Sequence, residues 1–192
     1  MGRGSSPDPA LAARFTVVLN QTQVALFSFA RGLVGEPELA RDITQDAFMD
    51  AWRAATQHER PFDGANDETG IRRWLFTVTY RHAAKALRRR GLIAWESLDA
   101  ERPHESGALA ETPRFEDQIA EAEALRAALL TLGPQDAACF LLQVAYGFST
   151  AEIAAIVDLH PDAVRKRLSR AKQRLRAAYC EQSPGTCAGR RS

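Results

Sequence analysis

The stretch that decides the fold is FSTAEIAAIVDLHPDAVRKRLSRAKQRLRAAY, which runs from Phe148 to Tyr179. It divides into two short helical patterns separated by residues 158–160, and the second pattern is densely basic. Between Val164 and Arg176, seven of the thirteen residues are arginine or lysine. A short helix, a tight turn and a basic helix are typical of a helix-turn-helix whose second helix lies in a DNA groove.

Capping residues mark where these two helices begin and end. Ser149 followed by Glu152 predicts a capping box, in which each side chain bonds a backbone N–H of the first turn. Asp158 can take a left-handed conformation in the turn. Pro161 suits the first position of the second helix, where its missing N–H has no helical partner. These signals favour DNA binding over the alternative, an amphipathic surface helix with a solvated basic face.

The second helix separates an apolar face from a polar one. The apolar positions are Val164, Leu168, Ala171 and Leu175, which recur at helical spacing. On another face lie Arg165, Ser169, Lys172 and Arg176. We therefore expect one face to pack into a core and the other to contact DNA, where phosphate contacts supply affinity and side chains near the helix start reach base edges.

Charge is segregated along the 192 residues, although the net charge is only +1. Residues 81–90 hold five arginines or lysines and no acid, whereas residues 95–123 hold nine acids and two bases. Two basic regions that flank an acidic one suggest two surfaces for nucleic acid, joined by a tether that avoids DNA. The hydrophobic content of 45% is ordinary for a globular protein.

Several classes of protein are disfavoured by what the sequence lacks. It has no apolar run of membrane-spanning length and no signal-peptide core, so we expect a cytoplasmic protein without membrane insertion. The four histidines are scattered without metal-ligand spacing, and no P-loop or nucleophile motif occurs. We expect no enzyme activity, no cofactor and no metal. Cys139 is expected in the core, and Cys180 and Cys187 are not expected to form a disulfide or a zinc site.

The fold class that follows is all-α: two small helical domains joined by a flexible acidic linker, the second domain carrying the helix-turn-helix. Helices are expected over Leu11–Gly32, Pro37–Thr56, Ile71–Arg90, Glu116–Leu132, Pro134–Tyr146, Ser149–Val157 and Pro161–Tyr179. The expected divisions are a disordered N-terminus (1–10), an N-terminal domain (11–91), a linker (92–116), a C-terminal domain (117–179) and a flexible tail (180–192).

The N-terminal domain carries its own candidate surfaces. Trp74, Phe76 and Tyr80 precede the arginines of the third helix, and aromatic rings among basic residues suit unstacked bases. Phe62 lies in the polar loop Gln57–Gly70 and could hold a flipped base. The second helix has an acidic and amide-rich face, pointing elsewhere, that suits a protein partner. The alternatives are that Trp74 is core, that Phe62 packs the loop and that the acidic face is only solvated.

Three segments together resemble extracytoplasmic-function sigma factors, the short two-domain subunits of bacterial RNA polymerase. These segments are GEPELARDITQDAFMDAWRA (Gly35–Ala54), IRRWLFTVTYRHAAKALRRRG (Ile71–Gly91) and the run Leu132–Tyr179. With their spacing they cover most of residues 11–179. The order of the segments makes the resemblance specific, because no single segment is distinctive.

The resemblance implies a function and roles for particular residues. It implies that the protein binds core RNA polymerase, recognises and melts promoter DNA, and has an anti-sigma factor as a partner. Docking on the clamp helices of the largest polymerase subunit is expected of Asp42, Gln45, Asp46 and Arg53. Contact with the −10 element is expected of Phe62, Tyr80, Arg81, Lys85 and Arg88. Contact with the −35 element is expected of Arg165, Lys166, Ser169, Arg170 and Lys172.

The chain departs from the family pattern at several positions. Arg81 stands where Asn is usual and Lys85 where Asp is usual, so the −10 preference is expected to be unusual. Asp158 replaces a Gly in the turn, and Gly133 occupies a common Pro position. His160 stands where Ser or Thr usually caps the recognition helix, and we expect that helix end to be less stable by about 1 kcal/mol. The loop that contains Phe62 is a few residues long for the family.

Two other functions compete with promoter-specific initiation. A stand-alone helix-turn-helix regulator explains the C-terminal domain but leaves the acidic face and the third helix without a role. A sigma mimic that sequesters an anti-sigma factor does not need the basic residues present in both domains.

Overall fold

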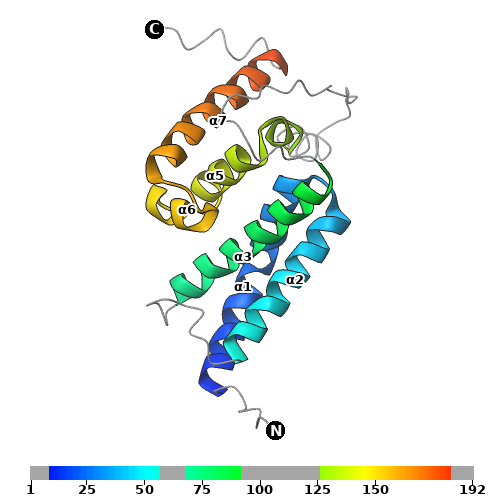
Figure 1. The fold of residues 1–192 in the computed structure, drawn as a ribbon, viewed down its shortest axis with the longest axis vertical. Coiled ribbons are helices and arrows are strands. Elements are labelled where there is room, and N and C mark those ends of the chain that lie inside the picture. Colours follow the sequence, from blue (N-terminus) through cyan, green and yellow to red (C-terminus); the bar gives the residue numbers. More distant parts are fainter. Residues whose placement is uncertain (1–8, 57–67, 92–125, 183–192) are drawn as a thin grey trace, which may run out of the picture.

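The computed structural model of the chain describes residues 9–56, 68–91 and 126–182. Every regular element in these ranges is an α-helix, which confirms the all-α expectation (Figure 1). The helices are α1 (Pro9–Val34), α2 (Pro37–Thr56), α3 (Glu68–Arg89), α5 (Pro134–Val144), α6 (Thr150–Val157) and α7 (Pro161–Gln182). Residues 126–131 form a further helical segment before α5.

Several helix ends differ from the expected ones. α1 continues past Gly32 to Val34, and it ends where Gly35 takes a φ of +78°, a backbone conformation that glycine adopts without steric cost. α3 begins at Glu68 rather than at Ile71, and α7 continues past Tyr179 to Gln182. The N-terminus expected to be disordered (1–10) is helical from Pro9, and the loop expected over Gln57–Gly70 ends before Glu68, where α3 begins. Residues 1–8, Phe62 with the rest of its loop, the acidic linker, most of the tail and the first part of the helix expected from Glu116 lie outside the described residues.

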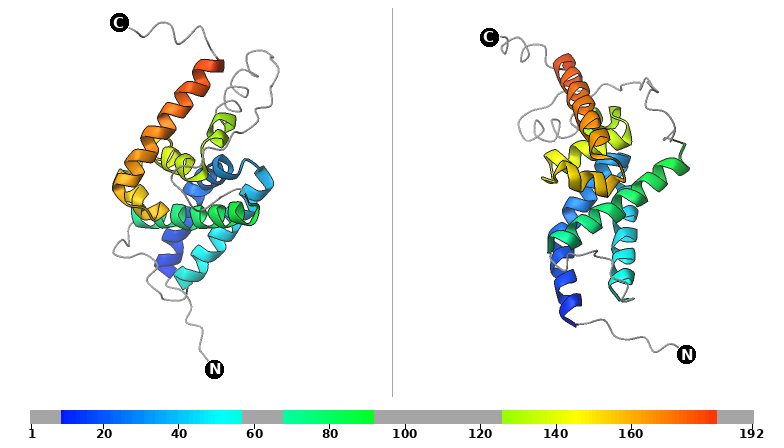
Figure 2. Two further views of the ribbon diagram at one scale, coloured as in Figure 1. Left: turned by 45° about the horizontal axis from the view of Figure 1, so that its top comes forward. Right: turned by 60° about the vertical axis from the view of Figure 1, so that its left-hand side comes forward.

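Helices α1, α2 and α3 pack into an N-terminal bundle (Figures 1 and 2). The centre is formed by large apolar side chains that recur at helical spacing, and these are fully buried: Phe15, Leu26, Phe29, Ile71 and Leu75. Small residues allow the helices to approach, since Ala40, Ala47 and Ala51 of α2 are also buried. Burial of these stripes, rather than intrinsic helix propensity, is what stabilises the bundle.

Helices α5, α6 and α7 form the C-terminal set, in which α7 packs on both α5 and α6 (Figure 1). Its core comprises Leu142, Ile153, Ile156, Val164 and Leu168. Cys139 is fully buried in α5, as expected, and burial raises the pKa of its thiol to about 12. Cys139 is therefore a small apolar core residue here rather than a reactive thiol.

The two sets of helices dock on each other around Phe76 of α3. The centroid of its ring lies 4.7 Å from that of Tyr146, 5.1 Å from that of Phe148 and 5.3 Å from that of Phe29. Phe29 belongs to α1, whereas Tyr146 and Phe148 belong to the turn between α5 and α6. Tilted and edge-to-face rings at these separations attract one another beyond the effect of area burial.

Polar contacts reinforce this junction. Arg72 donates from Nη2 to the carbonyl oxygen of Tyr146 at 2.7 Å, and its guanidinium lies 4.5 Å from the ring centroid of Phe148. The Tyr146 hydroxyl donates to the carbonyl oxygen of Ala25 at 2.9 Å. Burial raises the pKa of Tyr146 to about 12, so the hydroxyl keeps its proton and remains a donor.

One continuous buried core therefore runs through both sets of helices. Close approach of α1 to α5 adds to it, because a Cβ at Gly32 would lie 2.7 Å from Cδ1 of Leu141. The sequence predicts two domains connected by a linker, but the docking of these domains on each other is not predicted. The reason is that the docking contacts join residues far apart in the chain, which no local pattern reports.

Candidate nucleic-acid interface

The first helix of the helix-turn-helix begins with the capping box that the sequence predicts. Ser149 Oγ accepts from the backbone N–H of Glu152 at 3.3 Å, and the Ser149 N–H donates to Oε2 of Glu152 at 2.8 Å. Hydrogen bonds from Ser149 lower the pKa of Glu152. These bonds satisfy backbone groups that would otherwise be unpaired at the start of α6 and so fix its direction.

Replacing the cap should weaken the helix-turn-helix measurably. Ser149→Ala removes the hydroxyl that accepts the Glu152 N–H, so we expect the free energy of unfolding to fall by about 1 kcal/mol. Urea denaturation followed by circular dichroism measures the change. Ser169→Ala, an exposed serine within α7, is the matched control and should change stability by less than about 0.5 kcal/mol. Equal effects of the two substitutions would contradict the capping role.

The turn has the geometry that its residues predict. Asp158 ends α6 in the left-handed region, with φ 55° and ψ 56°, which confirms the role foreseen for it. His160 lies just before α7 and its Nδ1 accepts from the backbone N–H of Asp162 at 3.3 Å. His160 therefore caps the helix through its ring nitrogen, where the family pattern has a hydroxyl.

The candidate −35 residues lie on the outward side of α7. Val164, Leu168 and Ala171 are buried against α5 and α6. The exposed candidates are Arg165, Lys166, Ser169 and Lys172, and Arg170 is half-buried. The expected separation into a core face and a free polar face is therefore present, and four of the five candidates are open to a ligand.

One arginine of the basic run points inward. Arg167 pairs with Asp136 of α5, with 2.8 Å between Nη1 and Oδ1. Its side chain is only 18% exposed, and that of Asp136 is 6% exposed. The count of basic residues in α7 thus overstates the charge available to DNA, because Arg167 holds α7 to α5.

The candidate −10 residues divide into two groups. Arg81, Lys85 and Arg88 are exposed on α3. Tyr80 is only 6% exposed, and burial raises its pKa to about 12; Gln135 and Cys139 of α5 lie close enough to influence that pKa. Tyr80 and Phe76 therefore face the C-terminal set in this arrangement rather than a free surface. Phe62 lies outside the described residues.

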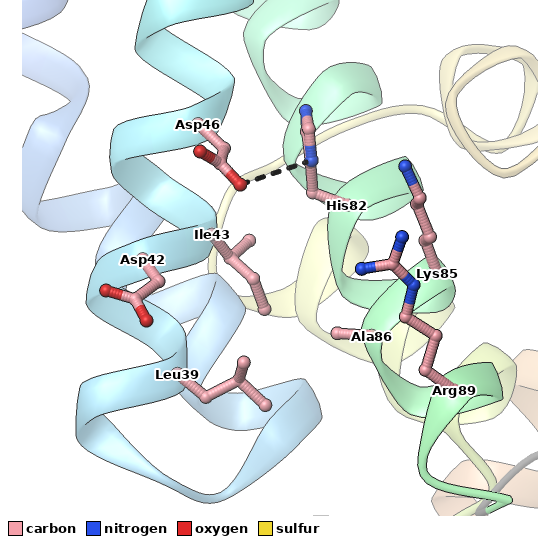
Figure 3. Close-up of a pocket in the computed structure, with 8 residues that line it drawn as sticks. All are labelled: Leu39, Asp42, Ile43, Asp46, His82, Lys85, Ala86 and Arg89. Atoms are coloured by element: carbon pink, nitrogen blue, oxygen red, sulfur yellow. Dashed lines mark ion pairs between the residues drawn. The ribbon is translucent and has the colours of Figure 1, made fainter.

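The candidate polymerase-docking residues lie on α2. Asp42, Gln45, Asp46 and Arg53 are all exposed, and Arg53 Nη1 donates to Oδ1 of Asp50 at 3.0 Å. Two of them, Asp42 and Asp46, line a pocket of about 260 Å³ between α2 and α3 (Figure 3). Lys85 and Arg89 line the same pocket from α3. The acidic and basic faces, which the sequence analysis placed apart, therefore border one groove.

A histidine that sequence reasoning missed joins the two sides of this groove. His82 Nε2 lies 2.8 Å from Oδ2 of Asp50, and Nδ1 lies 4.0 Å from Oδ2 of Asp46, the contact drawn in Figure 3. The Glu36 carboxylate, just before α2, and the Arg90 guanidinium, just after α3, are 2.6 Å apart and join these helix ends in the same way. Such contacts hold the two helices in register. Because the partners are 32 residues apart in the His82–Asp50 pair and 54 residues apart in the Arg90–Glu36 pair, no local sequence pattern predicts these contacts.

Within the three described ranges, no group of three or more His, Cys, Asp or Glu side chains could hold a metal ion. None of the helices described here is long and apolar enough to cross a membrane.

Two family descriptions match the two sets of helices. Residues 19–93 match Sigma-70 region 2, and residues 122–175 match Sigma-70, region 4. The first match covers most of α1 and all of α2 and α3, and the second covers α5, α6 and most of α7. A curated relative, the ECF RNA polymerase sigma factor SigE of Mycolicibacterium smegmatis, is 28% identical over 184 residues, which is 93% of this chain.

The chain belongs to the sigma-70 family, and the relative that it resembles along most of its length is of the extracytoplasmic-function type. The chain spans 66% of the length of the M. smegmatis relative. Among solved structures, the sigma factor RpoE of Bartonella quintana, crystallised in complex with the anti-sigma factor NepR, is similar to this sigma factor with a TM-score of 0.63. That match has 27% sequence identity and covers 86% of this chain and 96% of the other. The resemblance found in the sequence is thereby confirmed.

Each of the two matched regions contains one of the two exposed basic surfaces. Region 2 of this sigma factor contains the α2–α3 groove and the exposed Arg81, Lys85 and Arg88. Region 4 contains the helix-turn-helix and its outward basic face. A family of polymerase subunits that guide transcription initiation fits a chain with two separate exposed basic surfaces.

Proposed function

We propose that this chain is an alternative sigma factor that binds core RNA polymerase and directs transcription initiation at specific promoters. The observation that carries the proposal is the presence, in one chain and in order, of a region 2 bundle and a region 4 helix-turn-helix, each with an exposed basic face. A stand-alone helix-turn-helix regulator needs only the second of these. A sigma mimic needs neither basic face.

In this proposal α7 reads the −35 element from the major groove. Arg165, Lys166, Ser169 and Lys172 are exposed along its outward side, and Arg170 borders them. Lysine and arginine near phosphates supply salt-dependent affinity, while residues near the helix start discriminate between bases. Arg165 is the principal base-reading candidate because it lies in the second turn of the helix.

The −10 element is assigned to α3 and to the loop before it. Arg81, Lys85 and Arg88 offer exposed positive charge for the nontemplate strand, and Phe62 is proposed to hold an extruded base. A contact between Tyr80 and DNA requires the C-terminal set to move off α3, because Tyr80 is only 6% exposed in the docked arrangement. We therefore propose that the C-terminal set separates from the N-terminal bundle when the holoenzyme engages a promoter.

The polymerase is proposed to dock on α2 through Asp42, Gln45, Asp46 and Arg53. Asp46→Arg should weaken assembly with core polymerase by about tenfold or more, because it places a like charge against a surface that complements an acidic face. Co-migration of the purified proteins on gel filtration measures the loss. Gln21→Arg, an exposed position on α1, controls for added surface charge and should assemble normally. Normal assembly of the Asp46→Arg variant would reject this docking face.

Further parts of the proposal concern partners, chemistry and location. An anti-sigma factor is proposed as a partner, supported by the B. quintana relative, whose structure contains one. We propose that the chain has no catalytic activity of its own and acts in the cytoplasm with the polymerase. Neither a metal nor a cofactor is required for positioning DNA.

A promoter-dependent run-off assay tests the proposal directly. The purified chain is mixed with bacterial core RNA polymerase and a library of genomic promoter fragments, and transcripts are sequenced. We expect transcripts that start at discrete sites and share an upstream and a downstream motif. Core polymerase alone is the control. A stand-alone regulator would bind DNA without forming a holoenzyme, and a sigma mimic would yield no selective transcript.

A further inference from the structure

One acidic residue lies on the side of α7 that faces outward. Asp162, Arg165, Lys166 and Ser169 follow the spacing i, i+3, i+4, i+7, and all four are exposed. Between residues 161 and 180 Asp162 is the sole acid in the sequence. We propose that Asp162 is a specificity residue of the helix-turn-helix, which selects a cytosine in the −35 element and orients Arg165 for the neighbouring base.

Asp162 is held in place by the residues around it. One carboxylate oxygen, Oδ1, makes a short ion pair with Nη2 of Arg165. The other, Oδ2, lies 3.4 Å from Nδ1 of His160. When that nitrogen accepts a hydrogen bond from the Asp162 N–H, it carries no proton and cannot donate one to the carboxylate. Oδ1 therefore has a donor in Arg165, while Oδ2 keeps accepting capacity on a side chain that is 62% exposed.

The charge of Asp162 is unfavourable for DNA binding in general. The hydrogen bond and charge of Arg165 lower its pKa, so it is ionised at neutral pH. A carboxylate near phosphates opposes the electrostatic attraction that the rest of this face supplies. The observed position thus reduces affinity for any sequence that offers Asp162 no hydrogen-bond donor.

Base edges differ in whether they offer such a donor. An ionised carboxylate only accepts hydrogen bonds. In the major groove cytosine presents its N4 amino group as a donor, whereas guanine presents two acceptors. Asp162 therefore favours cytosine and rejects guanine. Arg165, positioned by the same carboxylate, presents its other N–H groups to a guanine, for which arginine is the usual partner.

A purely structural role would act differently. An acid in the first turn of a helix interacts favourably with the helix dipole and stabilises it by roughly 0.3–1 kcal/mol. Such a role changes stability and general DNA affinity but not the preference for one base over another. Base preference at single positions is therefore the measurement that separates the two roles.

The inference rests on the proposed −35 role of α7, so the test examines both. Holoenzyme reconstituted from core polymerase and the full chain is mixed with promoter fragments randomised over the upstream element, and bound fragments are sequenced. Wild type is compared with Asp162→Ala and with Asp162→Asn, which keeps the side-chain size. Asp158→Asn is the matched control, since it removes a nearby carboxylate that lies in the turn, and asparagine tolerates the left-handed conformation.

We expect wild type to select cytosine at one upstream position. Asp162→Ala should lose roughly 5- to 150-fold of that preference while binding unrelated DNA more tightly, and Asp162→Asn should shift the preference towards adenine. Asp158→Asn should leave every base preference unchanged. If Asp162→Ala raises binding equally on all sequences and base preferences persist, Asp162 is not a specificity residue. If wild type itself selects no upstream motif, the −35 role of α7 fails and the inference fails with it.

Discussion

Phe76→Ala should lower the free energy of unfolding by about 3–5 kcal/mol, one of the two largest effects expected of single substitutions in this sigma factor. Phe76 is fully buried, and its ring contacts Phe29 on one side and Tyr146 and Phe148 on the other. Alanine leaves a cavity where the N-terminal bundle and the C-terminal set meet, and rigid helices on both sides limit how far the cavity can collapse.

Urea denaturation of the full chain measures this loss. Val24→Ala is the control, since Val24 is a large apolar residue that is 69% exposed on α1, and its truncation should change stability by less than about 0.5 kcal/mol. A loss below about 1 kcal/mol for Phe76→Ala would mean that the ring is solvated in solution and that the two sets are not docked as described.

A double-mutant cycle isolates the docking itself. Phe148→Ala and Phe76→Ala each remove one ring of a pair that spans the junction, with 5.1 Å between centroids. If the sets dock in solution, the two losses should be non-additive by about 0.5–1.5 kcal/mol, the usual value of an aromatic pair beyond its buried area. Strict additivity would indicate that the rings do not meet.

Local signals in the sequence were sufficient to predict the helix-turn-helix. Ser149 and Glu152 cap α6, Asp158 takes the left-handed turn conformation and Pro161 starts α7, each as expected. These features depend on neighbours within four residues, so the sequence order determines them directly. Helical periodicity likewise identified which side of α7 is buried.

Long-range partners could not be predicted in the same way. Periodicity predicted that Phe76 and Tyr80 lie in a helix, but it did not predict which other helices pack against them. In the same way, the Tyr146 hydroxyl donates a hydrogen bond to a carbonyl oxygen 121 residues away in the chain. Periodicity also placed the acidic face of α2 away from the basic face of α3, whereas Asp42, Asp46 and Lys85 border one pocket. A residue pattern specifies a direction around a helix axis, and the packing of helices determines what lies in that direction.

Arg167 illustrates this limit, and it leads to the second large prediction. Asp136→Ala should lower the free energy of unfolding by about 3–5 kcal/mol, because it leaves the largely buried Arg167 guanidinium without its carboxylate. Asp136 also lies in the first turn of α5, where a negative charge is favourable. The position of α7 on α5 depends on this pair, so promoter binding should weaken together with stability.

The double variant Asp136→Leu/Arg167→Met shows which of two effects lowers the stability of Asp136→Ala. One is the burial of an unpaired Arg167 charge, and the other is the loss of the attraction between Asp136 and Arg167. Apolar side chains of similar volume often replace a buried ion pair without loss of stability, so the double variant should unfold close to wild type in urea. Asp158→Asn removes an exposed carboxylate of the turn and should change stability by less than about 0.5 kcal/mol. If Asp136→Ala is also that mild, water reaches Arg167, and the pair does not hold the recognition helix to α5.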